Sequence, residues 1–199
     1  MLIEKIIYGK NSASVIAEGK EYPVDPDCVV LYRIKAGEET NDASFAEFIA
    51  ESERVRCKKY LFSQIDRYSK TRKGYIGKLR EKGFSFGAVK AAVSRAEELG
   101  LIDDMRFAEN YYEKYKTKKG VNRIKNELKA KGIDRETLAF LDGQGDETEA
   151  AVSLAEKFMK RREKTPETRL KLLRHLAGKG FSFDTASKAA ASVFSEEDF

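Results

Sequence analysis

Proline, cysteine and histidine are scarce in this chain of 199 residues, which contains three, two and one of them. The two cysteines, Cys28 and Cys57, form no C-x-x-C pair, and this argues against a zinc site or a disulfide framework. We expect both to be partly buried thiols in a reducing compartment. The prolines are Pro23, Pro26 and Pro166, so long helices elsewhere in the chain are not interrupted by proline.

Long apolar runs are missing as well. No stretch approaches the roughly 18 residues that a membrane-spanning helix needs, and the N-terminus lacks the basic-then-apolar layout of a signal peptide. The sequence therefore predicts a cytoplasmic protein that has no contact with a membrane.

Charged residues are abundant instead, at 36% of the chain, beside 41% apolar residues. This composition is enough for a real core and indicates much solvated helix surface. The net charge of +5 permits a polyanionic partner without requiring one.

One short motif occurs three times: LREKGF at residues 79–84, LKAKGI at 128–133 and LAGKGF at 176–181. Its glycines are Gly83, Gly132 and Gly180, so the repeating unit is about 50 residues long. A recurrence of this length predicts one structural unit used three times, with each copy packed on its neighbours. Repeat arrays usually make long binding surfaces and not single deep catalytic pockets.

The first fifty residues have a different pattern. Short β-rich runs at residues 3–8, at 13–17 and near Tyr22 predict a small antiparallel meander. Asp25 and Pro26 then resemble the N-cap and first position of a helix, and Gly37 is expected to end it. We therefore expect a β-containing segment at residues 1–50, followed by three-helix repeats at 51–102, 103–146 and 147–199.

Each repeat is predicted to contain three helices. The first helices are expected at residues 53–68, 104–118 and 147–162, with apolar positions such as Cys57, Leu61, Ile65 and Tyr68 at helical spacing. The second helices begin near Thr71, Gly120 and Thr165 and end at the repeated glycine, which takes the left-handed C-cap conformation without strain.

The third helices begin at once, after good N-cap residues. These caps are Ser85, Asp134 and Ser182. The residue before each cap and the residue four positions after it are predicted to form a hydrophobic staple, which fixes the angle between the second and third helices. The staple pairs are Phe84 with Val89, Ile133 with Leu138 and Phe181 with Ala186. The third helix of the second copy is expected to be the shortest.

The candidates for chemistry have simpler explanations. Asp103 and Asp104 are expected to cap a helix and not to bind metal. His175 has no partner nucleophile, so we interpret it as a partly exposed structural residue. Tyr111 is expected to pack in the core, as is Tyr115 on the same helix face.

Tyr112, which lies about 100° away on that helix, is expected to be exposed. Gly74 and Gly77 do not form a phosphate loop. No catalytic residue, metal site or cofactor is predicted.

The basic residues of the second helices are the best functional signal. They are Arg72, Lys73, Lys78, Arg80 and Lys82; Arg123, Lys125, Lys129 and Lys131; and Arg169, Lys171, Arg174 and Lys179. If the repeats stack regularly, these charges make a discontinuous stripe that meets DNA phosphates or an acidic protein surface. The alternative is an ordinary solvated helix face, which the acidic neighbours Glu81 and Glu127 favour.

Three strings carry a family resemblance: KLREKGF at residues 78–84, GLIDDMRFAENY at 100–111 and GVNRIKNELKAKGI at 120–133. Together they resemble the RecX family of bacterial RecA regulators, and the resemblance extends from about Glu53 to Val193. It implies a mainly α fold, with tandem three-helix repeats in an elongated curved array after the small β-containing N-terminal segment.

The resemblance also implies a function. It implies binding to the RecA–single-stranded-DNA filament, in its groove, and modulation of ATP hydrolysis and strand exchange, usually downward. It carries over no catalytic residues. Two alternatives stay open, a free-standing nucleic-acid-binding protein and a helical scaffold for another protein; an enzyme ranks last. We expect a monomer that reaches single-stranded DNA directly or through RecA, and a frayed acidic tail at residues 196–198.

Overall fold

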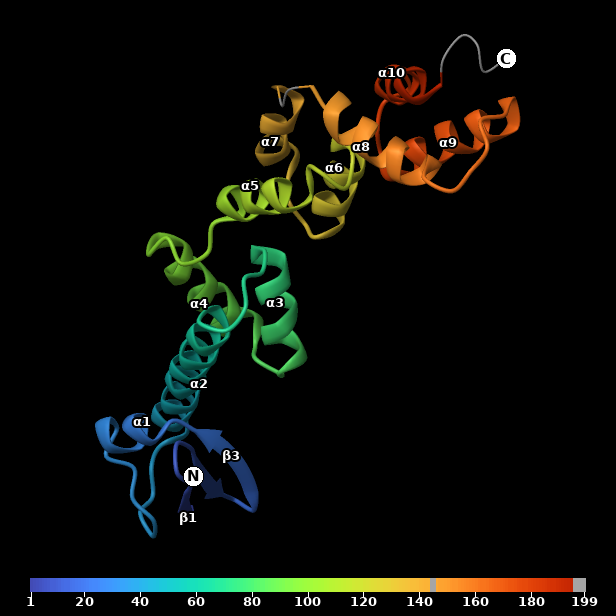
Figure 1. The fold of residues 1–199 in the computed structure, drawn as a ribbon. Helices are drawn as coiled ribbons and strands as arrows, with labels where there is room; N and C mark the ends of the chain where they lie inside the picture. Colours follow the sequence, from blue (N-terminus) through green and yellow to red (C-terminus); the bar gives the residue numbers. More distant parts are fainter. Residues whose placement is uncertain (144–145, 195–199) are drawn as a thin grey trace. The chain divides into compact units, whose positions relative to one another are not determined.

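The computed structural model describes residues 1–143 and 146–194 of the chain (Figure 1). Its contacts divide the chain into an N-terminal unit, Met1–Ile102, and a C-terminal unit, Asp103–Phe199. The fold is mainly helical with one small sheet near the N-terminus, as predicted. The acidic tail predicted at residues 196–198 lies outside the described residues.

The N-terminal unit begins with the predicted antiparallel meander. Its strands β1 (Ile3–Tyr8), β2 (Ala13–Ala17) and β3 (Lys20–Val24) pair in the order β1-β2-β3. Alternate residues of β2, namely Ala13, Val15 and Ala17, are buried because successive side chains of a strand point to opposite faces. Phe45 and Phe48 of the next long helix complete this core.

Helix α1 (Pro26–Leu31) starts as predicted but ends earlier. The side chain of Asp25 accepts a hydrogen bond from the Asp27 N–H at 3.1 Å, so it is the N-cap. The expected end at Gly37 is wrong, because Arg33 already takes a left-handed conformation with φ of 53°. Gly37 instead lies in a later turn, where its N–H donates to the carbonyl of Ile3 at 2.8 Å.

Helix α2 (Asp42–Ile65) joins two hydrophobic cores. Its predicted start at residue 53 is wrong, because Asn41 caps the helix by accepting a hydrogen bond from the Ser44 N–H at 2.7 Å. The first half of α2 packs on the sheet, and the second half brings the buried Cys57 and Leu61 to the first repeat. Tyr68, which was predicted to share this face, lies beyond the end of the helix and is 56% exposed.

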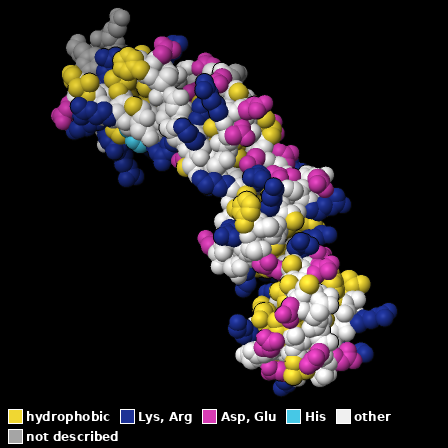
Figure 2. Space-filling view, turned by 180° about the vertical axis from the view of Figure 1, so that it is seen from behind, with side chains coloured by type: hydrophobic (Ala, Val, Ile, Leu, Met, Phe, Trp, Pro, Cys, Tyr) yellow, Lys and Arg dark blue, Asp and Glu magenta, His cyan; other side chains and the backbone are white. Residues whose placement is uncertain are grey.

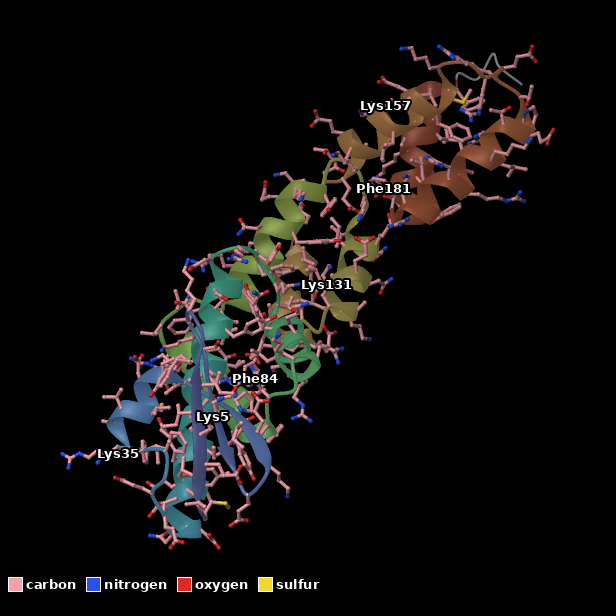
Figure 3. The ribbon with its side chains drawn as sticks, turned by 90° about the horizontal axis from the view of Figure 1, so that it is seen from below. Lys5, Lys35, Phe84, Lys131, Lys157 and Phe181 are labelled. Carbon is pink, nitrogen blue, oxygen red and sulfur yellow. The ribbon has the colours of Figure 1, made fainter. Side chains whose placement is uncertain are left out.

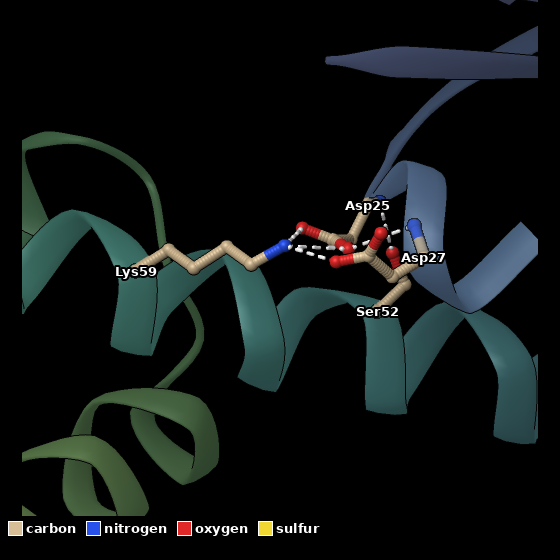
Figure 4. Close-up of polar contacts among 4 residues, drawn as sticks. All are labelled: Asp25, Asp27, Ser52 and Lys59. Carbon is tan, nitrogen blue, oxygen red and sulfur yellow. Dashed lines mark hydrogen bonds and ion pairs between the residues drawn. The ribbon is translucent and has the colours of Figure 1, made fainter. Parts of the chain in front are cut away.

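A buried carboxylate fastens α1 to α2 (Figure 4). Asp25 is almost fully buried, and its two oxygens accept hydrogen bonds from the Lys59 ammonium at 3.0 and 2.8 Å. The same ammonium reaches Asp27 at 2.7 Å, and the Ser52 hydroxyl accepts the Asp25 backbone N–H at 2.6 Å. A buried charge needs such partners, so this contact fixes the β meander and α1 on helix α2.

Three helices make up each repeat. The first repeat has the second half of α2, then α3 (Arg72–Glu81) and α4 (Phe86–Glu98). The second repeat has α5 (Asp104–Tyr115), α6 (Val121–Ala130) and α7 (Arg135–Leu138). The third repeat has α8 (Thr148–Met159), α9 (Pro166–Lys179) and α10 (Phe183–Val193). A 3-10 turn at Ala139–Gly143 follows α7, so the third helix of the second repeat is the shortest, as predicted.

The predicted caps are confirmed. The repeated glycines have φ values of 91°, 92° and 95°, in the left-handed region that favours glycine. The side chains of Ser85, Asp134 and Ser182 each accept a hydrogen bond from the backbone N–H three residues later. The staple residues are buried except Leu138, which is half-buried.

The first helices of the second and third repeats also end earlier than predicted. Helix α5 stops at Tyr115, because the Tyr115 carbonyl accepts hydrogen bonds from the N–H groups of Lys118 and Lys119 at 2.8 and 3.0 Å and closes a turn. Helix α8 spans 148–159 instead of 147–162, and the carbonyl of its last residue accepts the Arg162 N–H at 2.9 Å.

The cysteine prediction needs a correction too. Cys28 and Cys57 are fully and not partly buried, and burial raises the pKa of the Cys57 thiol to about 11.

Within residues 1–143 and 146–194, no helix is both long and apolar enough to cross a membrane.

Candidate partner-binding surface

The second helix of each repeat buries one narrow apolar stripe. Two side chains spaced four residues apart point into the core of each repeat. They are Tyr75 and Leu79 on α3, Ile124 and Leu128 on α6, and Leu172 and Leu176 on α9. The remaining faces of these helices point outward, and the predicted basic residues lie there.

In the first repeat, part of the predicted basic set is paired. The Arg72 guanidinium is 2.7 Å from the carboxylate of Glu97, and Lys78 is 3.9 Å from Glu81. Arg80 donates to the carbonyl of Phe84 at 3.1 Å.

Lys73 and Lys82 are exposed, and the Lys82 ammonium lies 5.8 Å from the centre of the Tyr60 ring. Exposed ion pairs contribute little to stability, so even the paired cations of the first repeat stay available to a partner.

In the second repeat, Glu127 holds several groups together. Its carboxylate oxygens lie 2.6 Å from the Lys119 ammonium and 3.0 Å from the Arg123 guanidinium, and they accept the Tyr111 hydroxyl at 2.8 Å. Burial raises the pKa of Glu127, but these three hydrogen bonds outweigh it and lower the pKa to about 2. Burial and the bond to Glu127 raise the pKa of Tyr111 to about 12.

This cluster changes the interpretation of the predicted stripe. Glu127 neutralises positive charge on α6, and Arg123 also donates to the carbonyl of Gly178 in the third repeat at 2.9 Å. Arg123 therefore connects two repeats. Lys131 lies 5.6 Å from the centre of the Tyr111 ring, at the edge of the cluster.

A surface hollow of about 630 Å³ lies between α6 and α7. Its lining includes the predicted residues Lys125 and Lys129, and also Arg135, which the sequence analysis did not single out. Lys125 forms an ion pair with Asp142 at its edge. Lys129 and Arg135 are exposed. The hollow is in the size range of small-ligand clefts, about 300–1,000 Å³, and combines cations with apolar wall atoms.

The third repeat carries its cations on α9. Lys171 pairs with Glu167 at 2.8 Å, both side chains being well exposed. Arg169 and Arg174 are exposed, and Lys179 is half-buried. His175 is half-buried, with its ring centre 5.0 Å from that of Phe158. Burial and then the nearby Lys179 lower its pKa, as expected for a structural histidine.

The second and third repeats meet at two glycines. The Gly120 N–H donates to the carbonyl of Lys179 at 3.0 Å. A Cβ atom added to Gly120 would lie 2.3 Å from the Gly180 carbonyl carbon, and one added to Gly180 would lie 2.3 Å from the Arg123 Cβ. Gly120 and Gly180 were predicted only as a helix start and a helix end, and nothing in their local sequence signals the close approach.

The other predicted residues are largely structural. Asp103 accepts the Arg106 N–H at 2.9 Å, which confirms it as a cap. The rings of Tyr111 and Tyr115 are 4.5 Å apart, on one face as predicted. Tyr112 is half-buried and not exposed, because its ring packs edge-on against Phe140. In the part of the chain that the structure describes, no group of histidine, cysteine and acidic residues is arranged to hold a metal ion.

Two exposed aromatic residues were not among the predicted functional residues. Phe86 is 72% exposed at the start of α4, and Phe183 is 80% exposed at the start of α10. The face shown in Figure 2 carries basic and acidic side chains next to one another, with hydrophobic side chains among them. The signal that could have found both residues is the string KGFSF, which occurs at residues 82–86 and again at 179–183.

These features define a tandem three-helix-repeat protein whose second helices present basic side chains on the surface. Comparison with known proteins agrees. The family models for the second and third three-helix domains of RecX match residues 103–139 and 145–189. A regulatory protein RecX from Clostridium perfringens strain SM101 is 30% identical over 159 residues, which cover 76% of this chain and 74% of that protein.

Two crystal structures are similar. One, of regulatory protein RecX, has a TM-score of 0.70 at 22% identity, covering 94% of this chain and 97% of that one. The other, of RecX from Lactobacillus salivarius, has a TM-score of 0.66 at 26% identity, covering 71% and 96%. The chain belongs to the RecX family of regulatory proteins, as its motifs predicted, and its role is regulatory.

Proposed function

We propose that this chain binds the RecA–single-stranded-DNA filament and lowers its rates of ATP hydrolysis and strand exchange. The observation that carries the proposal is the basic surface of the second helices, repeated in tandem in a member of the RecX family. Cations on α3, α6 and α9 supply charge to a polymer whose phosphates and acidic residues recur along its length.

The mechanism is occupancy. A protein that binds one state of a filament better than another shifts the equilibrium by its differential affinity for the two states. The three-helix units suit this role, because their packing is fixed by caps and staples and each unit buries its own core. None of these steps needs a catalytic residue or a cofactor.

Charge reversal at exposed cations tests the proposal. Lys73 and Lys129 are exposed members of the predicted stripe, on α3 and α6. Lys73→Glu combined with Lys129→Glu is expected to weaken co-sedimentation with RecA filaments by roughly tenfold or more at low salt, since unfavourable charge pairs across an interface cost several kcal/mol. The same variant is expected to inhibit the RecA ATPase less at a given concentration.

The matched control reverses two exposed lysines outside the second helices. Lys5 on β1 and Lys157 on α8 are suitable (Figure 3), and their reversal changes the net charge equally. Equal losses in the two variants would mean that only overall charge matters. Unchanged ATPase and strand-exchange rates at saturating wild-type protein would refute the proposed function itself.

A further inference from the structure

The first residue of the third helix is exposed in each repeat. These residues are Phe86, Arg135 and Phe183. Two positions earlier the side chain is buried in each repeat, at 7%, 3% and 4% exposure for Phe84, Ile133 and Phe181. Packing therefore explains the first aromatic residue of the KGFSF string (Phe84 and Phe181 are labelled in Figure 3) but not the second.

Exposure of these two phenylalanines forgoes a stabilisation that burial would provide. Burial of a phenylalanine side chain removes a large apolar area from water. A single exposed apolar residue is common on protein surfaces. Here the same residue is exposed at the same place in two repeats, at 72% and 80%. The recurrence indicates that these two residues contact a binding partner.

The equivalent residue of the second repeat restricts what that partner is. The second repeat has Arg135 where the others have phenylalanine. An apolar pocket on a protein accepts phenylalanine but not a guanidinium. What phenylalanine and arginine share is a flat π-bonded group, and both stack on nucleobases.

Cationic residues accompany these flat side chains, close in sequence in the first and third repeats and in one hollow in the second. Lys82 and Lys90, both exposed, stand four residues before and four residues after Phe86. Arg135 shares its hollow with Lys129. Lys179 stands four residues before Phe183. A flat side chain flanked by cations complements a nucleotide, whose base stacks while its phosphate meets the charge.

We propose that Phe86, Arg135 and Phe183 stack on the bases of a single-stranded nucleic acid, with one contact in each repeat. This inference rests on the proposed function and deepens it, because it gives the binding surface a direct contact with the DNA strand. The lysines on the neighbouring second helices serve the phosphates of the same strand.

Binding of fluorescently labelled oligothymidylate, measured without RecA, tests the stacking. Phe86→Ala and Phe183→Ala are each expected to raise the dissociation constant by roughly 5-fold to 150-fold, the range that corresponds to the loss of one stacked base. An abasic oligonucleotide of the same length is expected to bind the wild type more weakly than oligothymidylate does. Its affinity for the two alanine variants is expected to equal its affinity for the wild type. Leu31→Ala, at an exposed apolar residue (74%) on α1 and outside the repeats, is the control and is expected to change neither affinity.

A second variant reports on stacking directly. The chain contains no tryptophan, so Phe86→Trp introduces a single tryptophan at an exposed site, and its emission can be excited apart from that of the tyrosines. Its emission is expected to be quenched by oligothymidylate and unaffected by the abasic strand, with affinity retained. Wild-type affinity in the alanine variants, equal losses on both strands, or no wild-type binding at low salt would each overturn the proposal.

The outcomes separate this inference from the proposed function. If the alanine variants bound oligothymidylate normally but no longer sedimented with RecA filaments, the phenylalanines would contact protein, and only the stacking proposal would be wrong. If the wild type left the RecA ATPase unchanged at saturation, the proposed function would fail. The comparison of thymidine and abasic strands, made without RecA, would still decide the stacking.

Discussion

Replacement of Gly180 by alanine tests the joint between the second and third repeats. Gly180 has a φ of 95°, and an added Cβ would lie 2.3 Å from the Cβ of Arg123. Gly83 is the equivalent glycine of the first repeat, with a φ of 91° and no atom within 4 Å of an added Cβ. The two positions therefore share the conformational cost of alanine and differ in the steric one.

The magnitudes follow from this difference. A left-handed conformation costs a residue with a Cβ roughly 1–2 kcal/mol, and overpacking adds typically about 1–3 kcal/mol. We expect Gly83→Ala to lower the free energy of unfolding by about 1–2 kcal/mol and Gly180→Ala by about 2–5 kcal/mol. Urea unfolding measures both, and hydrogen exchange assigns each loss to its own unit.

Hydrogen exchange also reports on the joint itself. The Gly120 amide, which donates to Lys179, is expected to exchange faster in Gly180→Ala and unchanged in Gly83→Ala. Equal destabilisation by the two substitutions, with Gly120 protected in both, would refute the close approach of the two backbones.

Three further substitutions probe other contacts. Glu127→Gln is expected to lower the free energy of unfolding by about 1–3 kcal/mol at pH 7, because the folded pKa of about 2 lies below the unfolded value of 4.5. This stabilisation is complete above about pH 5 and is lost as the pH falls toward 2. The unfolding curves of wild type and variant should therefore converge in acid, and a difference that stays constant with pH would contradict the assignment. Leu128→Ala removes a fully buried side chain and is expected to cost about 2–5 kcal/mol in thermal or urea unfolding, against less than about 0.5 kcal/mol for the exposed Leu170→Ala. Lys59→Met leaves the buried Asp25 carboxylate without its cation and is expected to cost about 1–3 kcal/mol; an unchanged urea midpoint would show that the pair contributes nothing.

Local signals in the sequence predicted much of the fold. Ser85, Asp134 and Ser182 were recognisable as caps because an N-cap side chain acts on a backbone group three residues away. The repeated glycines were recognisable because only glycine takes the left-handed conformation without strain. Each of these features depends on a few neighbouring residues, so one sequence contains the whole signal.

Features that depend on distant residues were not predictable in this way. The contact of Gly120 with Gly180 joins positions far apart in the chain, and only the packing of two repeats brings them together. The pair of Arg123 and Glu127 follows from helical spacing, but the contact of Glu127 with Lys119 across a turn does not. The basic residues of α6 and their acidic neighbour Glu127 were therefore visible in the sequence, while the additional contact of Glu127 with Lys119 was not.

Helix α2 has a consequence for the integrity of the N-terminal unit. At 24 residues it is about 36 Å long, and it contributes Phe45 and Phe48 to one core and Cys57 and Leu61 to the other. Loss of either core would expose apolar side chains of this one continuous helix to water. The β meander and the first repeat should thus melt in a single cooperative transition, and deletion of the meander would leave two large phenylalanines bare to water and promote aggregation.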